Sequence, residues 1–222
     1  MNKLLIIFLS LAFLSGCKYP DGSVKPDGGV VIFSDLFTDN RNDWDFVHND
    51  STDIKILQTE YQFLLTGKSN KSGQLVWKTI QDLDTMVNFS IQADFRYIKG
   101  DSLAPYGLVF GFTDVKNYNF FGIEKSVAAS ADPYGGFIIG SRVDGVFTPS
   151  TDWTQFDLKD GWNTLKVEKN GSGRNNFSYS INGKVVATTK TPDYVKTIGF
   201  YAASNVSMAV NDVTVISGLA EK

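Results

Sequence analysis

The side chains that build disulfide frameworks and histidine sites are nearly missing from this chain. Its 222 residues include one cysteine, Cys17, and one histidine, His48. A single cysteine excludes an intramolecular disulfide, because that bond needs two thiols. A single histidine excludes a catalytic histidine pair and a metal site built from several histidines. His48 stands in a polar stretch with Asn49 and Asp50, where we expect a solvated side chain rather than a catalyst.

The chain also lacks an excess of positive charge. Lys and Arg number 21 against 24 Asp and Glu, which gives a net charge of −3, and there is no basic run. We therefore expect no nucleic acid among the partners. Hydrophobic residues make up 42% of the chain and charged residues 20%. This balance excludes a disordered chain and allows one large folded domain.

An apolar segment near the N-terminus is too short to span a bilayer comfortably. Lys3 precedes Leu4–Leu14, a segment of 11 residues whose apolar character is interrupted only by Ser10. A positive residue followed by such a segment is typical of a secretory signal peptide. The segment ends in Leu14-Ser15-Gly16-Cys17, which resembles a bacterial lipobox.

The lipobox resemblance implies that residues 1–16 are a lipoprotein signal peptide and that Cys17 is lipidated. Its thiol would receive a diacylglyceryl group, and the amino terminus freed by cleavage would receive an acyl chain such as palmitate. The alternatives are an ordinary signal peptide with a leftover thiol and an uncleaved helical anchor. Lys18 stands where an Asp would resemble an inner-membrane retention signal. The expected location is therefore the bacterial cell envelope, with the lipid anchor in the outer membrane.

No segment of any length has helical periodicity, and no repeat of fixed period is present. Residues 17–32 are rich in Pro, Gly, Asp and Ser and read as a flexible tether. From residue 33 to 217, short strand-like runs alternate with turns such as Asp144-Gly145 and Asn182-Gly183. A slip in the apolar phase near Asn211-Asp212 predicts a bulge. The expected strands are Val30–Phe37, Ile54–Leu57, Tyr61–Thr66, Gln74–Thr79, Val87–Tyr97, Tyr106–Phe112, Tyr118–Glu124, Gly135–Val143, Val146–Thr148, Thr164–Lys169, Phe177–Ile181, Lys184–Thr188, Thr197–Ala203 and Val206–Ile216.

About 12–14 such strands predict an all-β, two-sheet antiparallel β-sandwich of jelly-roll type. The clearest strand is Val87–Tyr97, whose residues alternate between apolar and polar. In Tyr106–Phe112 the same alternation puts Phe112 on the side of Phe110 and opposite Val109. The expected core consists of Phe89, Ile91, Phe95, Leu108, Phe110, Leu165, Val167, Phe177, Tyr179 and Ile181.

Four pieces, taken in order, resemble the concanavalin A-like lectin/glucanase superfamily, in particular its laminin-G-like and 3-keto-disaccharide-hydrolase-like domains. The likeness covers about Phe33 to Ile216 and implies a concanavalin A-like jelly roll. That superfamily holds lectins, glycan-binding modules, adhesion domains and glycosidases, so the resemblance specifies fold more than function. The pieces are FSDLFTDNRNDW (Phe33–Trp44), YGLVFGFTDVKNY (Tyr106–Tyr118), GWNTLKV (Gly161–Val167) and FSYSING (Phe177–Gly183).

The acidic pair of a retaining glycanase is missing. Such enzymes need two carboxylates about 5 Å apart, and family 16 glycosidases carry them in a Glu-x-Asp-x-x-Glu strand. The glutamates here, Glu60, Glu124, Glu168 and Glu221, are each more than ten residues from the next. We therefore expect no catalysis of this kind and no catalytic residue.

A polar row on the central strand is the candidate ligand site. Gln92, Asp94 and Arg96 share the face opposite Phe95, because successive strand side chains point to opposite sides. Arg142, on a strand expected to be a neighbour, and Trp153, on an expected loop, are candidates to join the row. Asp, Arg and an aromatic ring are what a sugar requires. The alternative is that these are ordinary solvated side chains paired across strands.

The remaining polar candidates are Asp114 and Asn117, which could hold calcium through oxygen ligands. The alternative is that Asp114 accepts backbone N–H bonds within its own turn. Of the four tryptophans, Trp44, Trp77 and Trp162 are expected to be packed and Trp153 exposed.

Three functions remain open. The leading interpretation is an envelope-anchored lipoprotein whose domain binds a glycan without catalysis. The alternatives are a protein-binding or adhesion domain of laminin-G type, with a cell-surface protein as partner, and a glycoside hydrolase resembling the 3-keto-disaccharide hydrolases.

Overall fold

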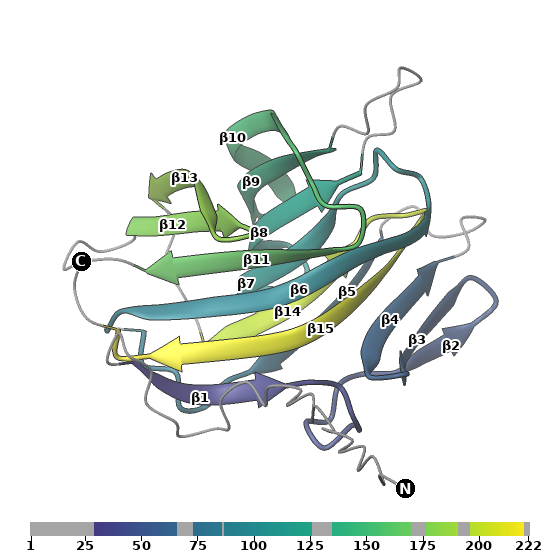
Figure 1. Cartoon of the computed structure of the whole chain (residues 1–222), viewed down its shortest axis with the longest axis horizontal. Helices are drawn as coiled ribbons and strands as arrows, with labels where there is room; N and C mark the ends of the chain where they lie inside the picture. Colours follow the sequence, from purple (N-terminus) through teal and green to yellow (C-terminus); the bar gives the residue numbers. More distant parts are fainter. Residues whose placement is uncertain are drawn as a thin grey trace, which may run out of the picture.

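The computed structural model describes residues 29–65, 73–85, 87–125, 135–169, 176–190 and 196–219. Over these ranges the regular structure is entirely β-strand, fifteen strands in two antiparallel sheets (Figure 1). The described residues contain no helix with the length and apolar character needed to cross a bilayer. The predicted lipidation site Cys17, the signal peptide and most of the tether lie outside the described residues. The all-β, two-sheet prediction is confirmed.

The larger sheet has nine strands in the order β13-β12-β11-β6-β15-β4-β3-β2, with β1 also paired to β15. Figure 1 shows β11, β6 and β15 side by side, with β7 and β14 of the other sheet behind them. The strands are β1 (Val30–Asp35), β2 (Val47–Asn49), β3 (Thr52–Leu57), β4 (Glu60–Leu65), β6 (Phe89–Gly100), β11 (Trp162–Lys169), β12 (Asn176–Ile181), β13 (Lys184–Lys190) and β15 (Val206–Ser217).

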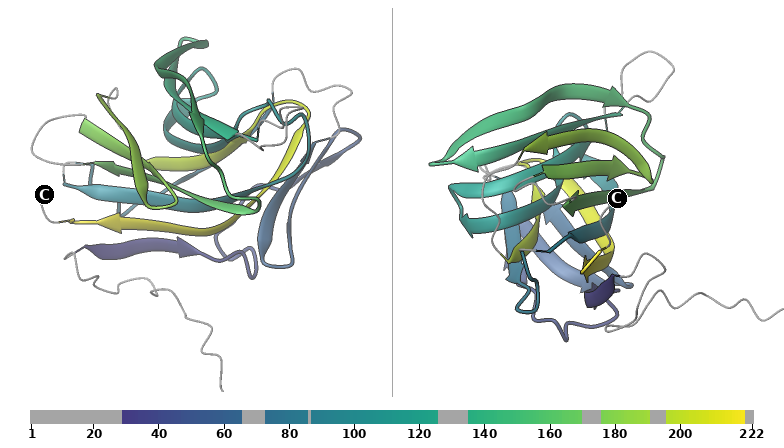
Figure 2. Two further views of the ribbon diagram at one scale, coloured as in Figure 1. Left: turned by 45° about the horizontal axis from the view of Figure 1, so that its top comes forward. Right: turned by 90° about the vertical axis from the view of Figure 1, so that its left-hand side faces the viewer.

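The smaller sheet has six strands in the order β10-β9-β8-β7-β14-β5. In the left panel of Figure 2 the hairpin of β9 and β10 stands up from the rest of the ribbon. The strands are β5 (Gln74–Thr79), β7 (Tyr106–Asp114), β8 (Asn117–Glu124), β9 (Gly135–Val143), β10 (Val146–Phe156) and β14 (Thr197–Ala202).

The main hydrophobic core lies between the two sheets. The alternation predicted for β6 is present, since Phe89, Ile91 and Phe95 are fully buried and Gln92, Asp94 and Arg96 are half-buried on the opposite face. All ten side chains predicted for the core are at most 1% exposed and belong to this cluster. Period-2 alternation is a local property of a strand, so the prediction needed no knowledge of the partner sheet.

The predicted phase of β7 is wrong after Phe110. Gly111 has φ +63, and the pairing of β7 with β8 shifts register between Phe110 and Asp114. The two extra residues on β7 let Phe112 turn to the outer face of the sheet, where it packs with Val109. Phe110 stays in the main core.

Two further observations concern the irregular strands β15 and β10. The predicted bulge in β15 is confirmed, with a register shift between Asn211 and Thr214 and φ +49 at Asp212. Strand β10 continues to Phe156, although the sequence predicted its end at Thr148. Pro149 is tolerated within it because β10 is an edge strand, where a missing N–H breaks no ladder on the open side. Trp153 therefore lies on a strand and not on a loop.

Candidate functional site

The polar row predicted as the ligand site lies on the outer face of the larger sheet. Arg96 donates from Nη2 to both carboxylate oxygens of Glu60, at 2.7 Å each. Its guanidinium carbon also lies 5.0 Å from the ring centroid of Trp162. Asp94 accepts a hydrogen bond of 2.6 Å from the Thr164 hydroxyl. Both charges thus have partners within the protein, as the cross-strand alternative anticipated.

The other two candidates belong to the other sheet. Arg142 is on β9 and Trp153 on β10, whereas the strands beside β6 are β11 and β15. The expectation that Arg142 and Trp153 join the row of Gln92, Asp94 and Arg96 in one groove is therefore wrong in its geometry. Whether either group binds a ligand stays a prediction.

Asp114 is engaged in its own turn. Its Oδ1 accepts a 2.7 Å hydrogen bond from the backbone N–H of Lys116, and both carboxylate oxygens lie 3.0 Å from Nδ2 of Asn117. These hydrogen bonds, that of the Asn117 side chain first, lower the pKa of Asp114. Asn117 also accepts from the backbone N–H of Asp144, which ties this turn to the β9–β10 turn. Within the described ranges no cluster of three or more His, Cys, Asp or Glu side chains could hold a metal ion.

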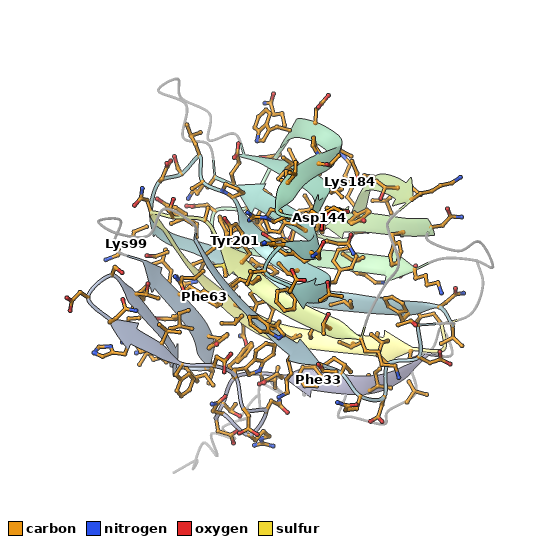
Figure 3. The ribbon with its side chains drawn as sticks, turned by 180° about the vertical axis from the view of Figure 1, so that it is seen from behind. Phe33, Phe63, Lys99, Asp144, Lys184 and Tyr201 are labelled. Atoms are coloured by element: carbon orange, nitrogen blue, oxygen red, sulfur yellow. The ribbon has the colours of Figure 1, made fainter. Side chains whose placement is uncertain are left out.

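The outer face of the smaller sheet carries a second, aromatic cluster that the sequence did not predict. Val109 and three rings are buried there, with Leu75, Ile138 and Tyr201 packed against them. Figure 3 shows the molecule from behind, with Tyr201 near the middle of the view. We call this surface the aromatic face and define it by Trp77, Phe112, Tyr118, Phe120, Phe147 and Tyr201.

The rings of the aromatic face contact one another across strands. Trp77 of β5 stacks on Phe112 of β7 with ring centroids 4.2 Å apart. Phe120 of β8 meets Tyr201 of β14 edge-on at 5.4 Å. Phe147 of β10 meets Phe120 edge-on at 6.4 Å. The result is a continuous aromatic surface over five of the six strands, β5, β14, β7, β8 and β10.

Glycines allow these rings to lie flat on the sheet. A Cβ atom at Gly122 would collide with the Phe120 ring, and one at Gly140 would lie 2.6 Å from Cζ of Phe147. Both glycines therefore leave the space that the neighbouring ring occupies. The same holds at Gly136, where a Cβ would collide with the indole of Trp153.

Two hollows have Tyr118 and Arg142 in their linings. The apolar one lies on the aromatic face, whereas Asn119 and Ser141 of the other share the face of the buried Phe121 and Ile139 and so belong to the inner side of the sheet. The first has a volume of about 230 Å³, and the second about 280 Å³. The first is mostly apolar and is lined by Pro105, Tyr118, Phe120, Ile138, Arg142, Phe147 and Tyr201. The second is lined by Gly111, Thr113, Asn117, Tyr118, Asn119, Ser141, Arg142 and Val143.

Arg142 is half-buried and contacts two neighbouring groups. Its Nε donates to the carbonyl oxygen of Gly145 at 3.1 Å, and its Nη1 lies 3.5 Å from the hydroxyl of Tyr118. Among the ion pairs of the described residues none includes Arg142. The guanidinium thus keeps donors that no carboxylate of the described chain accepts.

Tyr201 presents a neutral hydroxyl to the same place. Burial raises the pKa of Tyr201, and the nearby Tyr118 phenol raises it further, while Arg142 opposes both. The phenol therefore stays protonated over the physiological range and can both donate and accept a hydrogen bond.

Trp153 and Glu124 lie at another part of the smaller sheet. Trp153 is 45% exposed, as the sequence predicted, and its indole covers Gly136. Burial raises the pKa of the Glu124 carboxyl, a hydrogen bond from Trp153 lowers it, and Asp101 raises it. Gly136 is the cross-strand partner of Glu124.

One feature of the sequence does indicate that the smaller sheet is covered on its outer face. β7 and β8 are apolar at consecutive positions, as in Leu108-Val109-Phe110 and Phe120-Phe121, so both faces of these strands must be covered. Trp77, which was expected to be packed, is 41% exposed.

Comparisons with known proteins establish the fold and nothing narrower. No protein-family model matches the chain. No curated protein matches it either. Solved structures do match, and the first of them are longer proteins: the chain spans about two fifths of their length.

Three of these structures represent the range. The GH43 BlXynB protein from Bacillus licheniformis is 15% identical with a TM-score of 0.56, over 83% of this chain and 39% of that one. The conserved carbohydrate esterase of Shiga toxin-encoding bacteriophage phi24B is 11% identical with a TM-score of 0.56, over 86% and 100%. A Bacillus subtilis protein with a galectin-like fold is 13% identical with a TM-score of 0.53, over 86% and 97%. The chain therefore has a β-sandwich fold that carbohydrate-active proteins share.

Proposed function

We propose that this domain binds carbohydrate without catalysis and that the aromatic face is its binding surface. The observation that carries the proposal is the apolar hollow on that face, where aromatic rings meet the polar groups of Tyr118, Tyr201 and Arg142. Ligand sites usually combine a largely apolar lining with a few placed polar groups. A sugar matches this pattern, since its C–H faces pack on aromatic rings and its hydroxyls need hydrogen bonds.

The carbohydrate-related names of the similar structures support this proposal. They include glycoside hydrolases, a carbohydrate esterase and the CBM2 module of an evolved Dit of Lactobacillus casei BL23 phage J-1, which is 10% identical with a TM-score of 0.53. Their folds are alike, and function comes to this chain only through its own site.

Binding without catalysis is favoured by the acidic residues. Neither hollow is lined by a carboxylate, whereas retaining and inverting glycosidases both use two. Glu124 has the raised pKa of a general acid, but its neighbours are Trp153 and Asp101 and it lines neither hollow.

The proposed location is the bacterial envelope, with the domain held at the outer membrane through lipidated Cys17. The support is the lipobox-like Leu14–Cys17 behind a short apolar segment. Stable anchoring takes more than one acyl chain, which diacylglyceryl together with an N-acyl group would supply.

Protein binding is the second candidate, because the rim of the aromatic face exposes large apolar side chains. Trp77 is 41% and Phe147 38% exposed. Exposed apolar patches of this kind also mark protein–protein contacts.

The test is a glycan array probed with the labelled full-length protein, run beside a sugar-release assay. We expect binding without release. Phe147→Ala should weaken binding, and Phe46→Ala is its matched control, since both are exposed phenylalanines and Phe46 lies just before β2 of the other sheet. If Phe147→Ala binds any identified glycan as well as the parent, the aromatic face is not the site. Arg96→Ala then tests the row on β6. Failure to bind any glycan would favour the protein-binding candidate.

A further inference from the structure

The proposed site contains one charged group. Of the described side chains that line the two hollows, Arg142 alone is charged, and it lines both. The chain as a whole carries a net charge of −3. Arg142 is therefore an isolated positive charge on an acidic protein and not part of a generally basic surface.

Arg142 has no carboxylate partner among the described residues. The acidic side chains on the adjoining turns are Asp114, which is held by Asn117 and Lys116, and Asp144, whose backbone N–H bonds to Asn117. Neither forms an ion pair with Arg142. A partly desolvated charge is costly unless it is paired, so the site would be completed by an anion from outside.

Guanidinium geometry favours a carboxylate as that anion. The guanidinium is planar and offers parallel N–H donors that match the two oxygens of a carboxylate. The contacts of Nε with the Gly145 carbonyl and of Nη1 with the Tyr118 hydroxyl fix the plane of the group, while Nη2 and the second N–H of Nη1 remain for a ligand. The neutral Tyr201 hydroxyl on the same face adds a donor without adding charge.

The size of the apolar hollow indicates a ligand that extends beyond it. Ligand pockets usually have volumes of about 300–1,000 Å³, and this hollow is smaller, at about 230 Å³. A longer ligand would continue from this hollow over the rings of Phe120 and Phe147, with Arg142 at the border of the hollow.

We infer that the carbohydrate bound at this face is an acidic oligosaccharide, whose uronate carboxylate pairs with Arg142. This inference rests on the proposed function and narrows its substrate class. Neutral glycans would lack the group that compensates the guanidinium charge, so they should bind more weakly.

The test compares acidic oligosaccharides with chemically matched neutral ones. Oligosaccharides of galacturonate, mannuronate and glucuronate are titrated into the full-length protein by calorimetry, each beside its methyl-esterified form. The parent should bind at least one acidic form about tenfold more tightly than its ester, which is about 1.4 kcal/mol. Added salt should reduce this preference, because an exposed ion pair is screened.

Two variants assign the preference to Arg142. Arg142→Gln should remove the difference between acid and ester, and Arg142→Lys should keep part of it, because lysine retains the charge but not the planar fork. Arg96→Gln is the matched control and should leave the preference unchanged. Circular dichroism checks that each variant folds, and the acid–ester comparison on the parent stands even if one does not.

The outcomes separate the two proposals. If acid and ester bind equally to the parent, the uronate inference is wrong while carbohydrate binding stands. If the preference survives in Arg142→Gln, the carboxylate is bound elsewhere and the inference is wrong. If sulfated neutral-backbone oligosaccharides bind as tightly as uronates, the site selects anions and not carboxylates, which also overturns it. If no sugar of either form binds, the proposed function fails as well.

Discussion

Removal of the Asp35 carboxylate should destabilise the domain strongly, although Asp35 lies far from any proposed ligand. Asp35 ends β1 and is 6% exposed. Its Oδ1 accepts the backbone N–H of Phe37 at 2.7 Å. Its Oδ2 accepts Nε1–H of Trp44 at 2.7 Å and Nδ2–H of Asn42 at 2.8 Å. One carboxylate therefore fixes the whole turn from Asp35 to Trp44.

The cost of Asp35→Ala follows from which of these donors stay buried. The Asn42 amide is half-buried and can turn to water, whereas Phe37 and Trp44 are 0% and 3% exposed. A hydrogen bond to a charged group contributes about 1.5–3 kcal/mol, and a buried donor left unpaired costs about 1–3 kcal/mol. Phe37 also has φ +52, a conformation that a phenylalanine adopts only when its surroundings hold it there. With two buried donors orphaned, we expect a loss of about 3–5 kcal/mol in the free energy of unfolding.

Urea denaturation followed by tryptophan fluorescence measures this loss, since Trp44 itself reports on the turn. Asp39→Ala is the matched control: Asp39 is exposed and its ion pair with Arg41 is open to solvent, so its loss should destabilise the domain far less than the loss of Asp35. Trp44→Phe removes one donor and keeps a ring, and combining it with Asp35→Ala should give less than the sum of the single losses. A loss below 1 kcal/mol for Asp35→Ala, or strict additivity with Trp44→Phe, would refute the reasoning.

Three further predictions concern the core, the acid near Trp153 and the anchor. Phe95→Ala should cost about 3–5 kcal/mol in denaturant unfolding, because the ring is fully buried, and a change below about 1 kcal/mol would contradict the phase of β6. Burial raises the pKa of Glu124 in the folded state, so the folded chain binds this proton more tightly than the unfolded chain, and the parent loses stability as pH rises from the usual glutamate value through the raised one. Glu124→Gln should remove that loss, and melting curves of parent and variant that stay parallel from pH 4 to about 8 would contradict it. Labelled palmitate should be incorporated by the parent and not by Cys17→Ser, and equal labelling would contradict the lipoprotein proposal.

The fold could be predicted from the sequence because its signals are local. The alternation of Phe89 to Phe95 and the Asp144-Gly145 turn depend on neighbours in the chain, and the structure has them as expected. The site could not be predicted, because it depends on which strands share a sheet. β6 and β7 are consecutive in sequence but belong to different sheets, which separates Asp94 and Arg96 from Arg142.

The outward orientation of Phe112 could not be predicted from the sequence for a related reason. A positive φ at Gly111 is permitted by the residue but required only by the pairing with β8. Trp77 stacks on Phe112. Because the sequence did not show that Phe112 faces outward, it also could not show that Trp77 is part of an aromatic surface.

The irregular edge strand β10 lowers the tendency of this protein to aggregate through that edge. An open, regular edge strand is a template on which another chain can add a strand, and this is a common beginning of aggregation. β10 shifts register twice against β9, between Pro149 and Thr151 and between Thr151 and Thr154. Pro149 removes a donor, and each shift breaks the even spacing of N–H and C=O groups that an incoming strand would need. The edge that carries Phe147 and Trp153 thus exposes apolar rings while its backbone stays a poor partner for a second sheet.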